Sequence, residues 1–260
     1  MARKKVGLAL SGGAARGFAH LGVLKVLKEN NIPIDFIAGT SAGSFAGGAF
    51  AAGMSINEIV KIGEKISWFK ISGLSFSAKG LISNAPIAHL IKERFPHNRF
   101  EDLMIPFAAV ATDLETGKEK VFKEAGDLGF AICASCAIPG IFAPLQDTDG
   151  RLYIDGGVVS PVPTEAVRGM GADIVIAVDV ISSGATYWGK PSTLVGIIFQ
   201  SGMMLLRTAS QHQHFQADVV VIPEIAHLRP DEIRKMNEFV ELGEKAAADQ
   251  IDQIKRIIES

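Results

Sequence analysis

A serine between two glycines has the surroundings that a catalytic nucleophile needs. Ser41 lies in the pattern G-x-S-x-G, with Gly39 and Gly43 on either side. An apolar run precedes the pattern and a run of small residues follows it, which predicts a tight turn from strand to helix. Glycines there let strand and helix approach without Cβ clashes, and the helix N-terminus favours developing negative charge. The pattern predicts acyl transfer to Ser41, although an ordinary glycine turn can contain the same five letters.

A glycine-rich loop, SGGAARG at residues 11–17, follows the first apolar run and precedes a helical pattern. Such a loop directs backbone N–H groups at an anion, and an acyl-transfer enzyme needs these donors where the oxyanion forms. The alternative is a dinucleotide-binding G-x-G-x-x-G loop. In that frame Ala14 replaces the middle glycine between Gly12 and Gly17, and Asp35 precedes the second strand instead of ending it, so this alternative fits poorly.

An aspartate followed by two glycines, Asp155-Gly156-Gly157, comes at the end of a predicted strand. In an open α/β sheet, ligand-binding groups gather at the carboxyl ends of the strands. Asp155 could take the proton of Ser41 if burial raises the basicity of its carboxylate. Taken alone, the three residues also fit a plain turn.

Apolar runs bounded by turn residues alternate with helical patterns along the whole chain, which is typical of a helix-covered and largely parallel sheet. We therefore expect an α/β fold, with residues 1–260 forming one domain. The predicted strands are Val6–Leu10, Phe36–Gly39, Pro106–Thr112, Lys118–Phe122, Leu152–Asp155, Ile174–Val180 and Val219–Ile222. The predicted helices are Gly17–Glu29, Ser44–Ala52, Ile56–Ser67 with a capping box at Ser55 and Glu58, one from Asn84, one from Thr164, and Asp231–Ile258.

Two stretches, Trp68–Ile82 and Ile181–Leu206, mix large apolar residues with Gly and Ser. This composition suits a lid or an interfacial surface, and equally an ordinary core segment. Only the presence of an exposed apolar patch can separate these interpretations.

Four ordered blocks resemble one known family. SGGAARGFAHLGVL, GTSAGS, ASCAIPGIFAP and DGG look like the sequence blocks of the patatin-like phospholipases, and ATDLETG resembles a stretch of their small bacterial members. The similarity spans residues 6 to about 180 and is weaker in ADVVVIPEI, so residues 181–260 are expected to complete the domain with helices and one strand.

This resemblance implies a three-layer α/β/α sandwich with a mainly parallel central sheet, a Ser41–Asp155 dyad, an acyl-lipid substrate, and no metal or other cofactor. It also implies an oxyanion hole formed by the backbone around Gly12, Gly13 and Ala14, with Arg16 nearby. Ala14 departs from the usual triple glycine. If that position needs a positive φ, its Cβ costs about 1–2 kcal/mol.

Composition excludes several other classes. A net charge of −2 leaves no clustered excess of Lys and Arg for nucleic acid, and two cysteines cannot build a disulfide framework. No apolar segment reaches the length of a membrane span, and the basic N-terminus is followed by too short an apolar run for a secretory signal. We expect a cytoplasmic protein, with peripheral membrane contact and the oligomeric state left open.

Other polar groups receive structural interpretations. Cys133 and Cys136 form a C-x-x-C without a second pair at zinc spacing, and His212 and His214 lack a nearby carboxylate partner. The acids that end or flank strands, which are Asp113, Asp179 and Asp218, are expected to support the fold.

Two competing functions remain. The chain order Ser41, Asp155 and then His212, His214 or His227 matches an α/β-hydrolase triad, yet in that fold the nucleophile normally follows several strands and not two. A non-catalytic lipid-binding or regulatory protein could use the same fold.

Overall fold

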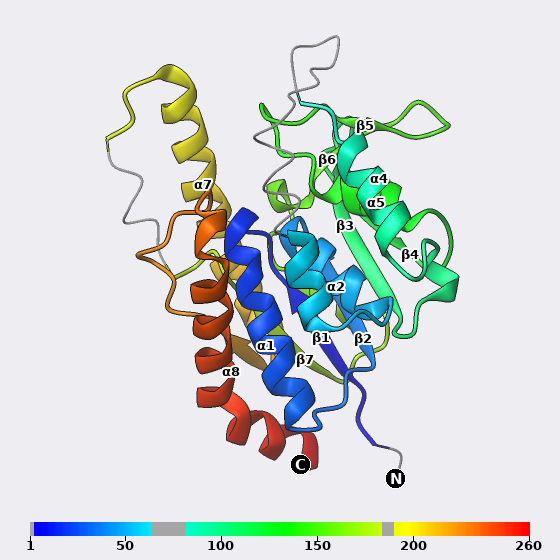
Figure 1. Cartoon of the computed structure of the whole chain (residues 1–260), viewed down its shortest axis with the longest axis vertical. Coiled ribbons are helices and arrows are strands. Elements are labelled where there is room, and N and C mark those ends of the chain that lie inside the picture. The colour runs from blue at the N-terminus through cyan, green and yellow to red at the C-terminus, as the bar shows by residue number, and fades with distance from the viewer. Residues whose placement is uncertain (1–2, 64–81, 184–189) are drawn as a thin grey trace.

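The computed structural model describes residues 3–63, 82–183 and 190–260. A sheet of eight strands runs through the described part of the chain in the order β5-β6-β3-β2-β1-β7-β8 (Figure 1). Strands β2 and β6 pair with successive parts of one edge of β3, and β4 pairs with its opposite edge. The strands are β1 Val6–Leu10, β2 Phe36–Thr40, β3 Phe107–Asp113, β4 Glu119–Lys123, β5 Leu145–Gln146, β6 Leu152–Asp155, β7 Ile174–Val178 and β8 Val219–Val221. The pairs among β3, β2, β1, β7 and β8 are parallel, whereas β4, β5 and β6 pair antiparallel.

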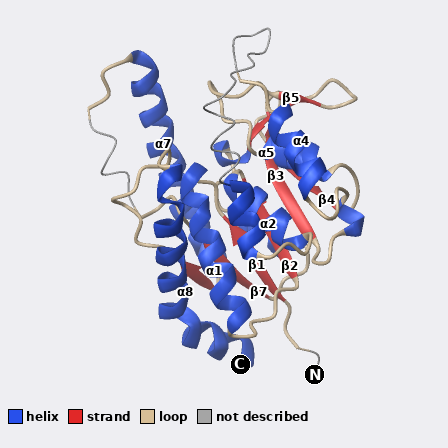
Figure 2. Ribbon diagram, viewed as in Figure 1, coloured by secondary structure: helices blue, strands red, loops and turns tan. Residues whose placement is uncertain are grey.

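Helices cover both faces of this sheet (Figure 2). They are α1 Phe18–Glu29, α2 Ala42–Ala51, α4 Ala85–Arg94, α5 Leu128–Ser135, α6 Thr164–Arg168, α7 Leu194–Gln213 and α8 Met236–Glu259, and residues 56–63 are helical as well. Side chains of β1 alternate between two cores: Leu8 and Leu10 pack with α1, α2 and α8, whereas Ala9 packs with residues of α6 on the other face. The predicted α/β sandwich with a mainly parallel sheet is confirmed.

The edge of β3 that faces β2 explains how two distant segments meet. Thr40, the last residue of β2, pairs with Val110 of β3. The next residue of β3, Ala111, pairs with Asp155 at the end of β6. Because β6 runs antiparallel to β3, the carboxyl ends of β2 and β6 point at each other along this edge. Asp155 thus reaches the end of β2 because β6 pairs antiparallel with β3. The sequence had instead suggested that β6 is one of the parallel strands of the sheet.

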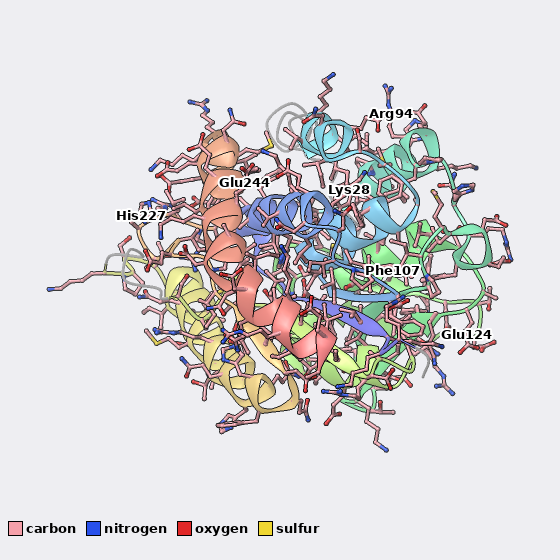
Figure 3. The ribbon with its side chains drawn as sticks, turned by 90° about the horizontal axis from the view of Figure 1, so that it is seen from below. Lys28, Arg94, Phe107, Glu124, His227 and Glu244 are labelled. Carbon is pink, nitrogen blue, oxygen red and sulfur yellow. The ribbon has the colours of Figure 1, made fainter. Side chains whose placement is uncertain are left out.

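Helices α1 and α8 lie against each other over the front of the sheet. Seen from below, α8 with Glu244 runs beside α1 with Lys28 (Figure 3). A Cβ at Gly22 would collide with backbone of α8, and a Cβ at Gly243 would collide with the carbonyl of Ala19. These two glycines allow the close approach, and an ion pair of 2.8 Å from Lys25 to Glu244 spans the contact.

The strands match the sequence prediction to within one residue at each end, except that β7 ends two residues early and the two-residue β5 was not foreseen. The capping box is confirmed, because the Ser55 N–H donates to Glu58 and the Glu58 N–H donates to the Ser55 hydroxyl. Helix α5 was missed, and α8 begins at Met236 and not at Asp231. The Ile181–Leu206 stretch contains most of α7. The Trp68–Ile82 stretch lies outside the described residues apart from Ile82. None of the described helices combines the length and the apolar character that crossing a bilayer requires.

Candidate active site

Ser41 occupies a strained turn between β2 and α2. Its φ of 53° and ψ of −121° lie in a region that non-glycine residues rarely adopt, at a cost of about 1–3 kcal/mol. The neighbouring glycines make the turn possible: a Cβ at Gly39 would collide with the backbone of Gly43, and a Cβ at Gly43 with the carbonyl of Leu10. The predicted strand–serine–helix turn is therefore present, with the N-terminus of α2 directly behind the serine.

The hydroxyl of Ser41 donates a hydrogen bond of 2.6 Å to Asp155 Oδ2. Both side chains are only 6% exposed, so this contact is shielded from bulk water. Burial raises the pKa of Asp155 to about 6, while the hydrogen bonds from Ser41 and from the Gly157 N–H (2.8 Å, to Oδ1) act in the opposite direction. The carboxylate is thus a much stronger base than an exposed aspartate and remains mostly ionised at neutral pH.

Ser135, the last residue of α5, holds the Ser41 turn in place through its hydroxyl group. Its hydroxyl accepts a hydrogen bond of 2.8 Å from the Ser41 N–H and donates one of 2.6 Å to the carbonyl of Val110 in β3. The Asp155 backbone is held in a similar way, because its N–H donates to Ala137 and its carbonyl accepts from the Thr112 hydroxyl. Sequence reasoning missed Ser135, since nothing in its local pattern indicates a partner 94 residues away.

The glycine loop lies against the serine. A Cβ at Gly12 would come within 3.4 Å of the Ser41 Cβ, and Gly13, with φ 151°, has Val180 where a side chain would be. The Gly12 N–H donates to the Pro161 carbonyl at 3.0 Å, so it is already engaged. In the part of the chain that the structure describes, the N–H groups of Gly13 and Ala14 have no protein acceptor.

Ala14 has a φ of 51°, a positive value that is costly for a residue with a Cβ. Two residues further on, Arg16 is 2% exposed and donates from Nε and Nη2 to the Leu228 carbonyl, at 3.1 and 2.8 Å. Arg16 therefore ties the segment after β8 to the glycine loop. Its expected part in an oxyanion hole stays a prediction.

His20 and Ser11 support the loop from the side of α1. His20 is fully buried, and its Nε2 lies 2.8 Å from the Ser11 carbonyl, which can only accept, so Nε2 donates. Burial lowers the pKa of His20 to about 4 and keeps the ring neutral, although the bond to Ser11 and the charge of Asp179 oppose this. The Ser11 hydroxyl accepts from the Val180 N–H at 2.9 Å. Ser11 belongs to the predicted glycine loop, whereas His20 was not singled out from the sequence, because histidine on an apolar helix face carries no distinctive pattern.

The histidines considered for a triad have other partners. His214 Nε2 lies 2.7 Å from Asp179, which is fully buried, and His227 Nε2 lies 3.1 Å from Glu238 at the surface. His212 is exposed on α7. Because Ser41 donates directly to Asp155, the arrangement does not match the order Ser-His-Asp. His214 does have a carboxylate partner, contrary to expectation, but this partner is 35 residues away in the chain.

The remaining polar candidates have structural surroundings. Asp113 accepts from the N–H groups of Glu115 and Thr116 in the turn after β3, and Asp218 accepts from Arg168 and from the Val175 N–H. Cys133 and Cys136 are free thiols, and burial raises the pKa of both. No group of His, Cys, Asp and Glu within the described ranges has the geometry to hold a metal ion.

Comparison with solved structures first defines the class of fold. The chain aligns over 97% of its length with VipD from Legionella pneumophila, at a TM-score of 0.58 and 14% identity, covering 67% of that chain. It aligns over 97% of its length with the heterodimeric ExoU-SpcU complex of Pseudomonas aeruginosa, at a TM-score of 0.54 and 16% identity, covering 52% of that chain. At these identities the likeness establishes a shared α/β fold.

The sequence then defines the family. Residues 8–168 match the family model described as patatin-like phospholipase, and this segment contains the glycine loop, Ser41 and Asp155. The chain belongs to the patatin-like phospholipase family.

Curated relatives agree with this assignment. An uncharacterized NTE family protein of Mycobacterium tuberculosis is 41% identical over 184 residues, which is 70% of this chain and 50% of the relative. The patatin-like phospholipase domain-containing protein 6 of Homo sapiens is 34% identical over 190 residues, which is 70% of this chain and 14% of that protein. The aligned region is thus at most about half the length of these relatives.

Proposed function

We propose that the protein is a serine acyl-ester hydrolase in which Ser41 is the nucleophile and Asp155 the base. The observation that carries this proposal is the 2.6 Å hydrogen bond from the Ser41 hydroxyl to Asp155 Oδ2, made at a strained turn and shielded from solvent. A serine is a weak nucleophile until an adjacent base removes its proton, and a carboxylate with a pKa near 6 can do so at neutral pH.

The reaction begins as the Ser41 Oγ attacks the ester carbonyl carbon and its proton passes to Asp155 Oδ2. The carbonyl π electrons move onto oxygen. Collapse of this tetrahedral species breaks the bond to the alcohol, which leaves with the proton from Asp155, and the acyl group stays on Oγ. Water then gives a proton to Asp155 and its oxygen attacks the acyl carbon. The second collapse releases the fatty acid, and Oγ recovers the proton.

The oxyanion that forms in each half-reaction needs donors, and the N–H groups of Gly13 and Ala14 are the candidates. They belong to the loop that contacts Ser41 and have no protein acceptor among the described residues. The positive φ of Ala14 belongs to this loop geometry and is the kind of strain that active sites retain. One such donor is worth about 2.7–4 kcal/mol of transition-state stabilisation.

The proposed substrate is an acyl lipid, either a phospholipid, a lysophospholipid or a neutral ester, and the family supports this class. The test is a comparison of wild type with Ser41→Ala on phospholipids, lysophospholipids and short p-nitrophenyl esters. We expect wild type to release fatty acid from a lipid and Ser41→Ala to lose at least a thousandfold of that activity.

Labelling by a fluorophosphonate separates the competing functions. Wild type should be labelled and Ser41→Ala should not, whereas Ser201→Ala, which changes an exposed serine of α7, should be labelled like wild type. If wild type binds lipid but stays unlabelled, the protein is a non-catalytic lipid-binding protein. A loss of several thousandfold in His212→Ala, His214→Ala or His227→Ala, with the fold intact, would favour the triad instead.

A further inference from the structure

Helix α7 presents its apolar side to solvent. Leu194, Ile197, Ile198, Met204 and Leu205 are 72%, 50%, 64%, 55% and 73% exposed. Counted from Leu194, their spacing is i, i+3, i+4, i+10 and i+11, so they share one side of the helix. We call this set the outward stripe. In Figure 1 the N-terminal turns of α7, in yellow, extend well beyond the ends of α1 and α8.

The opposite side of α7 holds the helix in this orientation. Leu206 contacts the Gly157 position, the Arg207 Nε donates to the Ser182 carbonyl at 3.2 Å, and Ser210 is fully buried. Near the C-terminus, Gln213 Oε1 accepts from the Val162 N–H. A surface helix normally turns its apolar side to the core and its polar side to water. Here the anchored side includes the polar groups, and the apolar stripe faces outward.

This stripe is connected to the catalytic turn through one contact. Leu206, next to Leu205, packs on Gly157, and the Gly157 N–H donates to Asp155. Val158, the following residue, is 52% exposed. Any surface that bound the outward stripe would therefore lie close to the Asp155–Gly157 segment, which contains the proposed base.

The size of the stripe favours a lipid surface over a second copy of the chain. From residue 194 to 205 a helix extends about 18 Å, and one face of it covers roughly 200 Å². A stable protein interface needs roughly 800 Å² from each partner. Such a stripe is sufficient for an interfacial helix, which inserts its apolar face at the boundary of headgroups and acyl chains.

The charges around the stripe fit an anionic bilayer. No Asp or Glu occurs from residue 180 to 217, and the exposed Lys190 lies four residues before Leu194, whereas Arg207 belongs to the anchored side of α7. Anionic headgroups therefore meet no acidic side chain from this segment, and the ammonium group of Lys190 is attracted to them.

We propose that the outward stripe of α7 docks on the surface of an anionic phospholipid bilayer and holds the Asp155–Gly157 turn next to it. This inference rests on the proposed function for its choice of lipid as partner, but binding can be measured without catalysis. The protein would lie on the membrane with α7 parallel to the plane, and the substrate would come from that same surface.

The test is flotation with vesicles of phosphatidylcholine and phosphatidylglycerol, in a Ser41→Ala background so that no lipid is consumed. Leu205→Glu should lower the partition coefficient about tenfold, and Ile198→Glu with Leu205→Glu about a hundredfold. Met104→Glu is the matched control: Met104 is 72% exposed, like Leu205 at 73%, but it precedes β3 at the opposite end of the sheet. Met104→Glu should float like its parent.

With Ser41 restored, all three variants should hydrolyse a soluble short-chain ester at the wild-type rate, which also verifies their folding. Equal flotation of Leu205→Glu and Met104→Glu, or no flotation of the parent, would overturn the docking proposal even if ester hydrolysis is intact. If wild type floats with the vesicles but hydrolyses no ester, the proposed function is wrong and the docking proposal stands. A dimer in light scattering that Leu205→Glu dissociates would assign the stripe to a second copy.

Discussion

Asp155 is subject to two opposing influences. Burial raises its pKa to about 6, and the hydrogen bonds from Ser41 and Gly157 lower it by a smaller amount. A base must be deprotonated to accept the serine proton, so activity should be absent below this pKa and present above it.

We therefore expect kcat/KM on a short p-nitrophenyl ester to rise with pH through a midpoint near 6 and to level off above it. The measurement is a rate profile from about pH 4.5 to 8.5. A midpoint near that of an ordinary aspartate, or a flat profile, would show that Asp155 is not the titrating base.

The same pKa affects stability. Because the folded pKa is raised above the unfolded value of 3.8, the native state holds this proton more tightly, and the favourable contribution is lost as pH rises through about 6. At neutral pH the buried carboxylate is ionised, which lowers the free energy of unfolding, and Asp155→Asn removes this cost. As a companion to the rate profile, it should be inactive at every pH and melt no lower than wild type at neutral pH.

At the scale of elements, β2, α2 and α5 jointly hold the nucleophile. Ser135→Ala would remove a bridge between the Ser41 N–H and the Val110 carbonyl, and would leave both buried without this partner. We expect a loss of about 1–3 kcal/mol in the free energy of unfolding, and at least a tenfold fall in kcat with KM nearly unchanged, because the attack geometry loosens.

Ser210→Ala is the matched control for Ser135→Ala. Ser210 is also fully buried, and its hydroxyl donates to the Arg207 carbonyl away from the serine turn. It should lower the melting temperature without changing kcat on a soluble ester. If both variants lose stability alike and neither loses kcat, Ser135 is a purely structural residue.

The elements also mark how far sequence reasoning reaches. The turn at Ser41 was predictable because its glycines, the apolar strand and the small-residue helix are all local in sequence. Asp155 became a candidate from its place at the end of a predicted strand, and its role as base came from the family resemblance, because Asp-Gly-Gly alone also fits a plain turn. Ser135 was not predictable, since its contacts join residues far apart in the chain. The orientation of α7 was not predictable either, because the period of its apolar residues does not say which side faces the core.

At the scale of the whole molecule, the long helix α8 closes the front of the sheet against α1. Gly243→Ala should separate these helices, because the new Cβ would overlap the Ala19 carbonyl, and should cost about 1–3 kcal/mol in thermal unfolding. Gly202→Ala is the matched control: Gly202 also lies in a helix but has open space around it, so this change should stabilise the protein by roughly 0.5–1 kcal/mol. A melting temperature of Gly243→Ala equal to that of wild type would contradict the close packing.

The shared edge of β3 has a practical consequence for anyone who refolds this protein. Ser41 and Asp155 meet only because consecutive residues of β3, Val110 and Ala111, receive β2 and β6. A slip of one residue in either pairing would move the two groups about 3.3 Å apart along the strand and reverse the faces of the side chains. Such a sample would retain the circular dichroism of an α/β protein and yet be inert. Turnover is thus a more stringent measure of the native sheet alignment than any spectrum of secondary structure.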